Sequence, residues 1–202
     1  GAFNIRQYEY GIIISFTEEE FSGMGAYLTF EKKGELYSYS LQRISKLSLV
    51  SQLFSPIDLE NVSEIKVYYE NPSPIEVFSM SLSGEIVYPD SSFHFSLLND
   101  DIIIKGETNT FYDTVFVWSK PVENLIIKEG KIITGPYSLE PALIPYNRGI
   151  NLNITMEGIY SADHLGIYYY NEKLSDWTYL TSTLTTDSLF ISTTILSGEI
   201  FA

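Results

Sequence analysis

Cysteine is absent from the 202 residues of this chain, and histidine occurs only twice, at His94 and His164. The lack of cysteine excludes disulfide frameworks, thiol chemistry, and zinc or iron–sulfur sites with cysteine ligands. A site that needs two imidazoles would require these two histidines to meet in space. No apolar run reaches the roughly 18 residues of a transmembrane helix. We therefore predict no metal site, no bound cofactor and no membrane insertion.

Basic residues are also few. The chain has 12 Lys and Arg against 26 Asp and Glu, which gives a formal net charge of −14. Because so acidic a chain repels the phosphates of nucleic acids and the head groups of anionic lipids, we exclude both as partners. Hydrophobic residues make up 45% of the sequence. That fraction is enough to bury a core and argues against disorder.

The composition that is present is typical of β-strands. Aromatic residues make up 15% of the chain, with 16 Tyr and 12 Phe. Short apolar or alternating runs, as expected of strands with one buried face, occur at 12–16, 27–30, 65–68, 102–104, 115–118 and 150–154. Clusters of Gly, Pro, Asn and Asp separate them. The pattern predicts an all-β protein of antiparallel, immunoglobulin-like β-sandwiches. In residues 39–54, where apolar residues recur every three, a helix stays an open alternative.

The two halves of the chain resemble one another. Residues 11–15 match residues 101–105, and further strand-like segments follow in the same order in both halves. The repeat predicts two similar tandem modules, residues 1–99 and 100–202. Since no linker separates them, we expect a closely packed interface. The alternative is that two β-rich stretches align simply because both contain apolar strands.

Several polar groups could carry chemistry, but each has a simpler structural explanation. The acidic run at 18–20 could bind a cation, yet we predict a solvated loop. Residues 99–101 with Asp113 could supply oxygen ligands to calcium, yet a turn explains them. His94 alternates with phenylalanines, which places it on a polar strand face, and His164 has no partner next to it on the same face of an extended chain. No residue is therefore predicted to be catalytic.

Aromatic residues are the best candidates for contact with a ligand or partner. The main group is Tyr168, Tyr169, Tyr170, Trp177 and Tyr179, with Tyr68, Tyr69 and Trp118 as further candidates. A strand alternates its faces, so the tyrosine triplet directs at least one ring outward, and we expect Tyr169 to be that ring. Exposed Tyr and Trp stack on sugars and anchor proteins. The alternative is core packing, above all for Trp177, which stands where a sandwich has one large buried ring.

The second half also carries segments that resemble a known family. The segments are Asp101-Ile102-Ile103-Ile104, 111–117, 137–141, Pro145-Tyr146-Asn147-Arg148-Gly149, 150–152, 165–170, 177–180 and 197–202. In these segments residues 100–202, and more weakly 8–90 through the repeat, resemble the accessory β-sandwich region of Bacteroidetes-type secreted lysostaphin-like (LytM-type) zinc metallopeptidases. Such peptidases bind zinc through His-x-x-x-Asp and His-x-His motifs. Neither motif occurs here, so the resemblance implies the non-catalytic part of such a protein.

These observations together lead to one functional hypothesis and two alternatives. We predict a non-catalytic accessory module of a secreted, periplasmic or cell-envelope bacterial protein. It would position a neighbouring peptidase domain of the same parent chain or attach it to cell-wall glycan or peptidoglycan. The first and last residues lead us to expect a piece of a longer protein. The alternatives are a carbohydrate-binding module with a flat row of exposed aromatic residues, and a hydrolase whose paired carboxylates the sequence does not single out.

Overall fold

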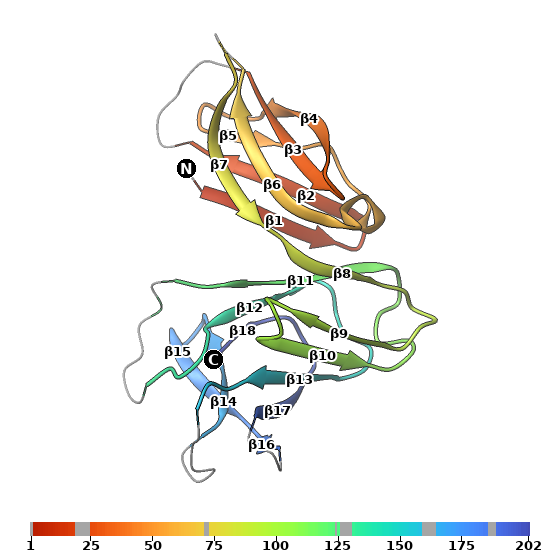
Figure 1. The fold of residues 1–202 in the computed structure, drawn as a ribbon, viewed down its shortest axis with the longest axis vertical. Helices are drawn as coiled ribbons and strands as arrows, with labels where there is room; N and C mark the ends of the chain where they lie inside the picture. Colours follow the sequence, from red (N-terminus) through yellow and green to blue (C-terminus); the bar gives the residue numbers. More distant parts are fainter. Residues whose placement is uncertain are drawn as a thin grey trace. The chain divides into compact units, whose positions relative to one another are not determined.

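The computed structural model describes residues 2–18, 25–70, 73–123, 125, 131–158, 165–185 and 189–202. Within these residues the chain is all-β and its strands pair antiparallel into sheets (Figure 1), which confirms the predicted all-β class of antiparallel sheets. One short 3-10 turn, η1 (Pro56–Leu59), interrupts the strands. No helix in the described part is long and apolar enough to cross a membrane.

The chain forms two compact units, Gly1–Leu82 and Ser83–Ala202. The first unit is one antiparallel sheet of seven strands in the order β1-β2-β5-β4-β3-β6-β7. Its strands are β1 (Ala2–Tyr8), β2 (Gly11–Thr17), β3 (Ala26–Lys32), β4 (Glu35–Arg43), β5 (Ser48–Val50), β6 (Val62–Tyr69) and β7 (Ile75–Ser81).

The sheet of the first unit rolls up until its two outer strands meet. Phe3 of β1 stacks on Phe78 of β7, with ring centroids 4.4 Å apart, although the two strands are the opposite edges of the hydrogen-bonded order. Along β3 and β6 every second side chain points into the space that the rolled sheet encloses, and the side chains that do so are apolar. Phe30 and Phe54 are fully buried there and lie 5.0 Å apart. The unit therefore buries one core inside a single curled sheet.

The second unit contains two sheets. Its strands are β8 (Ser83–Val87), β9 (Phe93–Leu97), β10 (Ile102–Gly106), β11 (Val115–Pro121), β12 (Tyr137–Glu140), β13 (Ile150–Thr155), β14 (Ile167–Asn171), β15 (Asp176–Leu180), β16 (Ser182–Leu184), β17 (Phe190–Ile195) and β18 (Ile200–Phe201). Five strands form the order β16-β17-β13-β10-β9, and six form the order β15-β14-β18-β12-β11-β8.

The inward side chains of both sheets in the second unit make one hydrophobic core. Ile102 and Ile104 from the five-stranded sheet belong to the same buried cluster as Val115 and Val117 from the six-stranded sheet. In β10 and β13 the core residues alternate with more exposed ones, as a pleated strand requires. Tyr146 is buried in this cluster with its ring edge-on to Phe111, 4.9 Å between centroids. This unit is a sandwich in which the two sheets share their inner faces.

Two details differ from the sequence-based prediction, and one open alternative is decided. The chain divides before β8, not at 99/100, because β8 pairs with β11 and β9 pairs with β10, and Val87 and Leu97 lie in the second core. Residues 39–54 contain β4 and β5 rather than a helix. The strands that the repeat aligns also pair differently. β3 pairs with β6, whereas their counterparts β11 and β13 lie in different sheets.

Candidate functional site

The β14–β15 hairpin gathers most of the predicted aromatic residues on one face. In its register Tyr168 pairs with Tyr179, and Tyr170 pairs with Trp177. Ile167, next to Tyr168, is buried, so the alternation of the strand directs Tyr168 and Tyr170 to the opposite, outer side. These four residues, Tyr168, Tyr170, Trp177 and Tyr179, are called the aromatic face below.

The rings of the aromatic face are paired edge to face. Tyr168 and Tyr179 have centroids 5.5 Å apart and an interplanar angle of 63°, and Tyr170 and Trp177 are 5.4 Å apart at 67°. Tyr168 is 41% exposed and Tyr179 is 51% exposed. The two pairs follow one another at a spacing of two residues, which is roughly 7 Å along a strand. The surface is therefore a short aromatic ridge and not a flat platform.

Tyr169 does not present its ring outward, so that prediction is wrong. It packs against the core of the second unit, together with Leu180. Its register partner on β15 is Thr178, between the two aromatic pairs. The reason is the alternation itself: because Ile167 faces inward, so does the residue two positions later. Three consecutive tyrosines do not themselves indicate which of them faces the core. The buried residue next to them, Ile167, does.

Trp177 is half-buried, and the indole Nε1, although shielded from solvent, has no hydrogen-bond partner among the described residues. The tryptophan that is fully buried in this unit is Trp118, which stacks on Phe116 in β11 with centroids 5.5 Å apart. Trp177 therefore does not fill a fully buried position, and Trp118 does not take its place in the core, because it lies on the opposite face of β11 from the core residues Val115 and Val117. Of the other candidates, Tyr68 stacks on its cross-strand partner Tyr27 in the first unit.

Several contacts hold the aromatic face in place. The Asn171 carboxamide oxygen accepts hydrogen bonds from the backbone N–H of Lys173 and of Leu174, which closes the turn of the hairpin. Tyr168 and Ala202 exchange both backbone hydrogen bonds, which extends the pairing of β14 with β18 inside the six-stranded sheet. The Tyr179 ring lies beside Gly166, where an added Cβ would come within 2.4 Å of the ring. A glycine there lets the ring approach the backbone.

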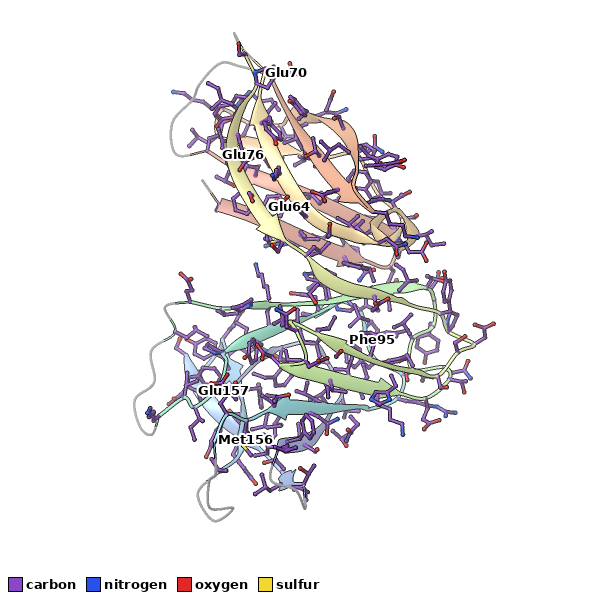
Figure 2. The ribbon with its side chains drawn as sticks, in the orientation of Figure 1. Glu64, Glu70, Glu76, Phe95, Met156 and Glu157 are labelled. Carbon is purple, nitrogen blue, oxygen red and sulfur yellow. The ribbon has the colours of Figure 1, made fainter. Side chains whose placement is uncertain are left out.

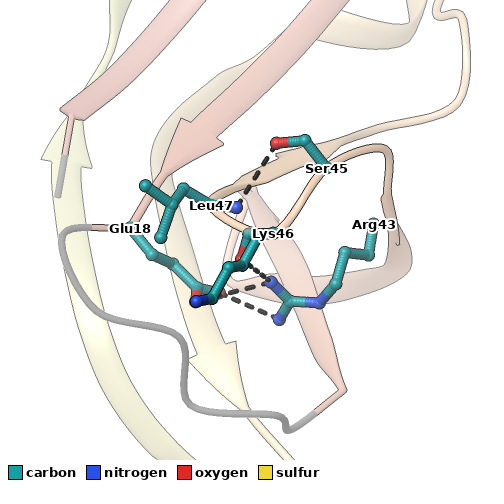
Figure 3. Close-up of polar contacts among 5 residues, drawn as sticks. All are labelled: Glu18, Arg43, Ser45, Lys46 and Leu47. Carbon is teal, nitrogen blue, oxygen red and sulfur yellow. Dashed lines mark hydrogen bonds and ion pairs between the residues drawn. The ribbon is translucent and has the colours of Figure 1, made fainter.

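The acidic run at 18–20 is only partly within the described residues, and its first member is not solvated. Glu18 is buried, and its carboxylate forms an ion pair of 3.1 Å with the Arg43 guanidinium (Figure 3). Arg43 also donates to the Lys46 carbonyl, and the Glu18 N–H donates to the Leu47 carbonyl. The predicted loop therefore begins with a structural ion pair. Residues 19 and 20 lie outside the described residues.

The remaining polar candidates are structural or lie outside the described part. Residues 98–100 all have positive φ and turn the chain between β9 and β10, as the turn prediction for 99–101 expects. His94 is exposed on β9, on the polar face predicted for it. His164 lies outside the described residues. Within the described residues no group of three or more His, Asp or Glu side chains could hold a metal ion.

The first unit carries a polar surface on the outer face of β6 and β7. Glu64 and Glu76 lie on neighbouring strands (Figure 2). Lys66 lies 3.2 Å from the Glu64 carboxylate and 3.6 Å from the Glu76 carboxylate. The Tyr68 hydroxyl donates to Glu76, and the Ser79 hydroxyl donates to Glu64. These side chains bind one another, so this surface stabilises the pairing of β6 and β7 and leaves the aromatic face as the better candidate site.

Comparison with models of known protein families finds no match to the chain, and a search of curated proteins finds no significant match.

Proposed function

We propose that this chain is a non-catalytic binding module of a secreted or cell-envelope bacterial protein, which attaches its parent chain to cell-wall glycan. The single observation that carries the proposal is the aromatic face. Four aromatic side chains lie together on the outer side of one hairpin, two of them about half exposed. Aromatic side chains bury a large area on binding at little loss of conformational entropy, and their polar tips hydrogen-bond at the same time.

The geometry of the rings favours one type of glycan. A flat row of coplanar rings would suit the face of an insoluble, crystalline polysaccharide. Here each pair is inclined by more than 60°, so the rings form a ridge. We infer that the ligand is a single, flexible glycan chain, whose successive sugar units contact Tyr168 with Tyr179 and then Tyr170 with Trp177.

Charge supports the same class of ligand. The aromatic face consists of uncharged side chains in a chain of net charge −14. A polyanion would be repelled by the chain as a whole, whereas a neutral glycan meets no such barrier. From the resemblance of residues 100–202 to accessory regions of secreted peptidases, we infer that this binding serves the cell envelope and positions a neighbouring domain of the same parent chain.

Affinity electrophoresis tests this proposal. The protein is run through native gels that contain soluble cell-wall glycan strands or other neutral glycans, and retardation reports binding. The variant Tyr168→Ala/Tyr179→Ala removes the two most exposed rings of the aromatic face, and we expect the glycan to retard it much less than the unchanged protein. Tyr10→Ala is the matched control, because Tyr10 is 64% exposed but lies in the first unit.

Two results would argue against the proposal. One is migration of the unchanged protein that no glycan alters. The other is equal retardation of the unchanged protein and of the Tyr168→Ala/Tyr179→Ala variant, which would place glycan binding elsewhere on the chain. Cleavage of the glycan by the purified protein would reject the non-catalytic part of the proposal.

A further inference from the structure

A groove opens in the first unit between the end of the β3–β4 hairpin and the 3-10 turn η1. It is independent of the aromatic face, which belongs to the second unit. Its lining is mostly polar, with one aromatic ring and one aliphatic side chain. The lining residues are Lys32, Lys33, Glu35, Tyr37, Ile57, Glu60 and Asn61. The mouths of rolled sheets are common places for small-molecule sites.

Both walls of the groove are fixed by local structure. On one side, Lys33 and Gly34 have positive φ and form the tight turn that joins β3 to β4. On the other side, the Asp58 carboxylate accepts the Ser55 N–H at the start of η1. The Lys32 ammonium bridges the two walls by donating to the Asp58 carbonyl. The groove is therefore formed before any ligand arrives.

Tyr37 is the aromatic surface of the groove. It is 42% exposed, although it lies on the same side of β4 as Tyr39, which packs against the buried Phe54 with centroids 4.9 Å apart. The Tyr37 hydroxyl donates to the Glu35 carboxylate at 2.8 Å, and this contact fixes the orientation of the ring. The Lys32 ammonium lies 5.6 Å from the ring centroid. The ring is thus positioned at the end of the core without being covered by it.

The charges that line the groove balance. Lys32 and Lys33 supply two ammonium groups, while Glu35 and Glu60 supply two carboxylates. An ion gains little from such a lining, but a ligand with many hydroxyl groups can both donate to carboxylates and accept from ammonium and amide groups. We infer that this groove binds a neutral saccharide unit, which stacks on Tyr37 and hydrogen-bonds to Lys33, Glu60 and Asn61.

The inference is tested by titrating the isotope-labelled full chain with two neutral disaccharides, N,N′-diacetylchitobiose and cellobiose, and following backbone amide resonances. We expect at least one of them to cause saturable shifts confined, within the first unit, to residues 32–37 and 57–61. Tyr37→Ala should weaken this binding by roughly tenfold, the loss expected for one stacked aromatic contact, while Tyr37→Phe keeps the ring and should bind nearly as well.

The variants separate this site from the aromatic face. Tyr168→Ala/Tyr179→Ala should leave the shifts at 32–37 and 57–61 unchanged, even if glycan retardation is lost. Conversely, failure of the aromatic face in electrophoresis does not affect the titration of the groove. The inference is overturned if neither disaccharide shifts these resonances, if Tyr37→Ala binds as well as the unchanged chain, or if glucuronate or glucosamine, each carrying a charge, binds more tightly than both neutral sugars.

Discussion

At the scale of single residues, the pair of Glu18 and Arg43 shows how a charge can be placed inside an apolar unit. The Glu18 side chain is 1% exposed and that of Arg43 is 25% exposed. The carboxylate also accepts from both terminal nitrogens of the guanidinium, at 3.1 and 3.5 Å. Removal of one partner from a buried pair leaves an uncompensated charge, which costs more than the pair contributes to stability.

We therefore expect Arg43→Ala to lower the free energy of unfolding by about 3 kcal/mol, because it leaves the Glu18 carboxylate buried without its cation. Urea unfolding followed by circular dichroism measures the change. Arg148→Ala is the matched control, since it removes the same charge from an exposed position. Glu18→Gln combined with Arg43→Met should recover part of the loss. Equal effects of Arg43→Ala and Arg148→Ala would contradict a structural role for the ion pair.

Glu199 is a second residue whose environment can be measured. Burial raises the pKa of its carboxyl group, the Ser197 hydroxyl lowers it in part, and the Glu172 carboxylate raises it further. A carboxyl group whose pKa is higher in the folded than in the unfolded state destabilises the fold when ionised. This destabilisation is present above the folded pKa and disappears as the pH falls below the unfolded pKa.

The sign of this shift predicts the behaviour of Glu199→Gln. At about pH 7, where an ordinary Glu is ionised, the variant should be more stable than the unchanged protein, and at about pH 3 the difference should vanish. Thermal unfolding at both pH values measures it. Glu157→Gln, at an exposed site, controls for the change in net charge. A gain in stability that is the same at both pH values would show that the carboxyl charge is not its cause.

At the scale of elements, the β14–β15 hairpin depends on its turn. The Asn171 side chain accepts two backbone N–H groups of that turn, at 3.1 and 3.3 Å, and Ser175 at its end has a φ of 48°. Tyr170 and Trp177 are the aromatic pair nearest to this turn. Order in the turn therefore sets the position of one half of the aromatic face.

Replacement of Asn171 by Ala should loosen this end of the hairpin, because the Lys173 N–H loses its side-chain acceptor and the Leu174 N–H keeps only the Asn171 carbonyl. We expect a loss of about 1 kcal/mol in the free energy of unfolding and weaker glycan retardation in affinity electrophoresis. Ser91→Ala, in the turn before β9, is the control for loss of a polar side chain in a loop. Unchanged retardation together with a normal fold would mean that Tyr170 and Trp177 do not contribute to glycan binding.

The elements also show which features the sequence could predict. Strand positions follow from alternation, and the outward placement of His94 follows from Phe93 and Phe95 on either side. The sequence does not predict which residues of the Tyr168–Tyr170 triplet face outward, since three identical residues show no alternation between polar and apolar side chains. The partner of Glu18 is also hidden, because Arg43 is brought to it by the pairing of β2 with β5 and of β5 with β4.

At the scale of the whole molecule, the sequence predicts strand content better than it predicts the division of the chain. The Asn99-Asp100-Asp101 cluster has the composition of a boundary between modules, but it forms the turn between β9 and β10. The pairing of strands that are distant in the sequence decides where a unit begins. β8 belongs to the second unit because it pairs with β11, from which β9 and β10 separate it in the sequence. Local turn signals cannot distinguish a hairpin from a domain boundary, because both need the same residues.

The division before Ser83 can be tested with two fragments, residues 83–202 and residues 100–202. The shorter fragment lacks β8 and β9, which pair with β11 and β10 and supply Val87 and Leu97 to the core. Each fragment contains both tryptophans of the chain, Trp118 and Trp177. Their fluorescence therefore reports the folding of each fragment directly. We expect a cooperative urea transition for 83–202 and a gradual, non-cooperative change for 100–202, because the shorter fragment exposes the edges of both sheets and part of the core. Equal cooperativity in the two fragments would show that β8 and β9 are not integral to the second unit and would restore the boundary at 99/100.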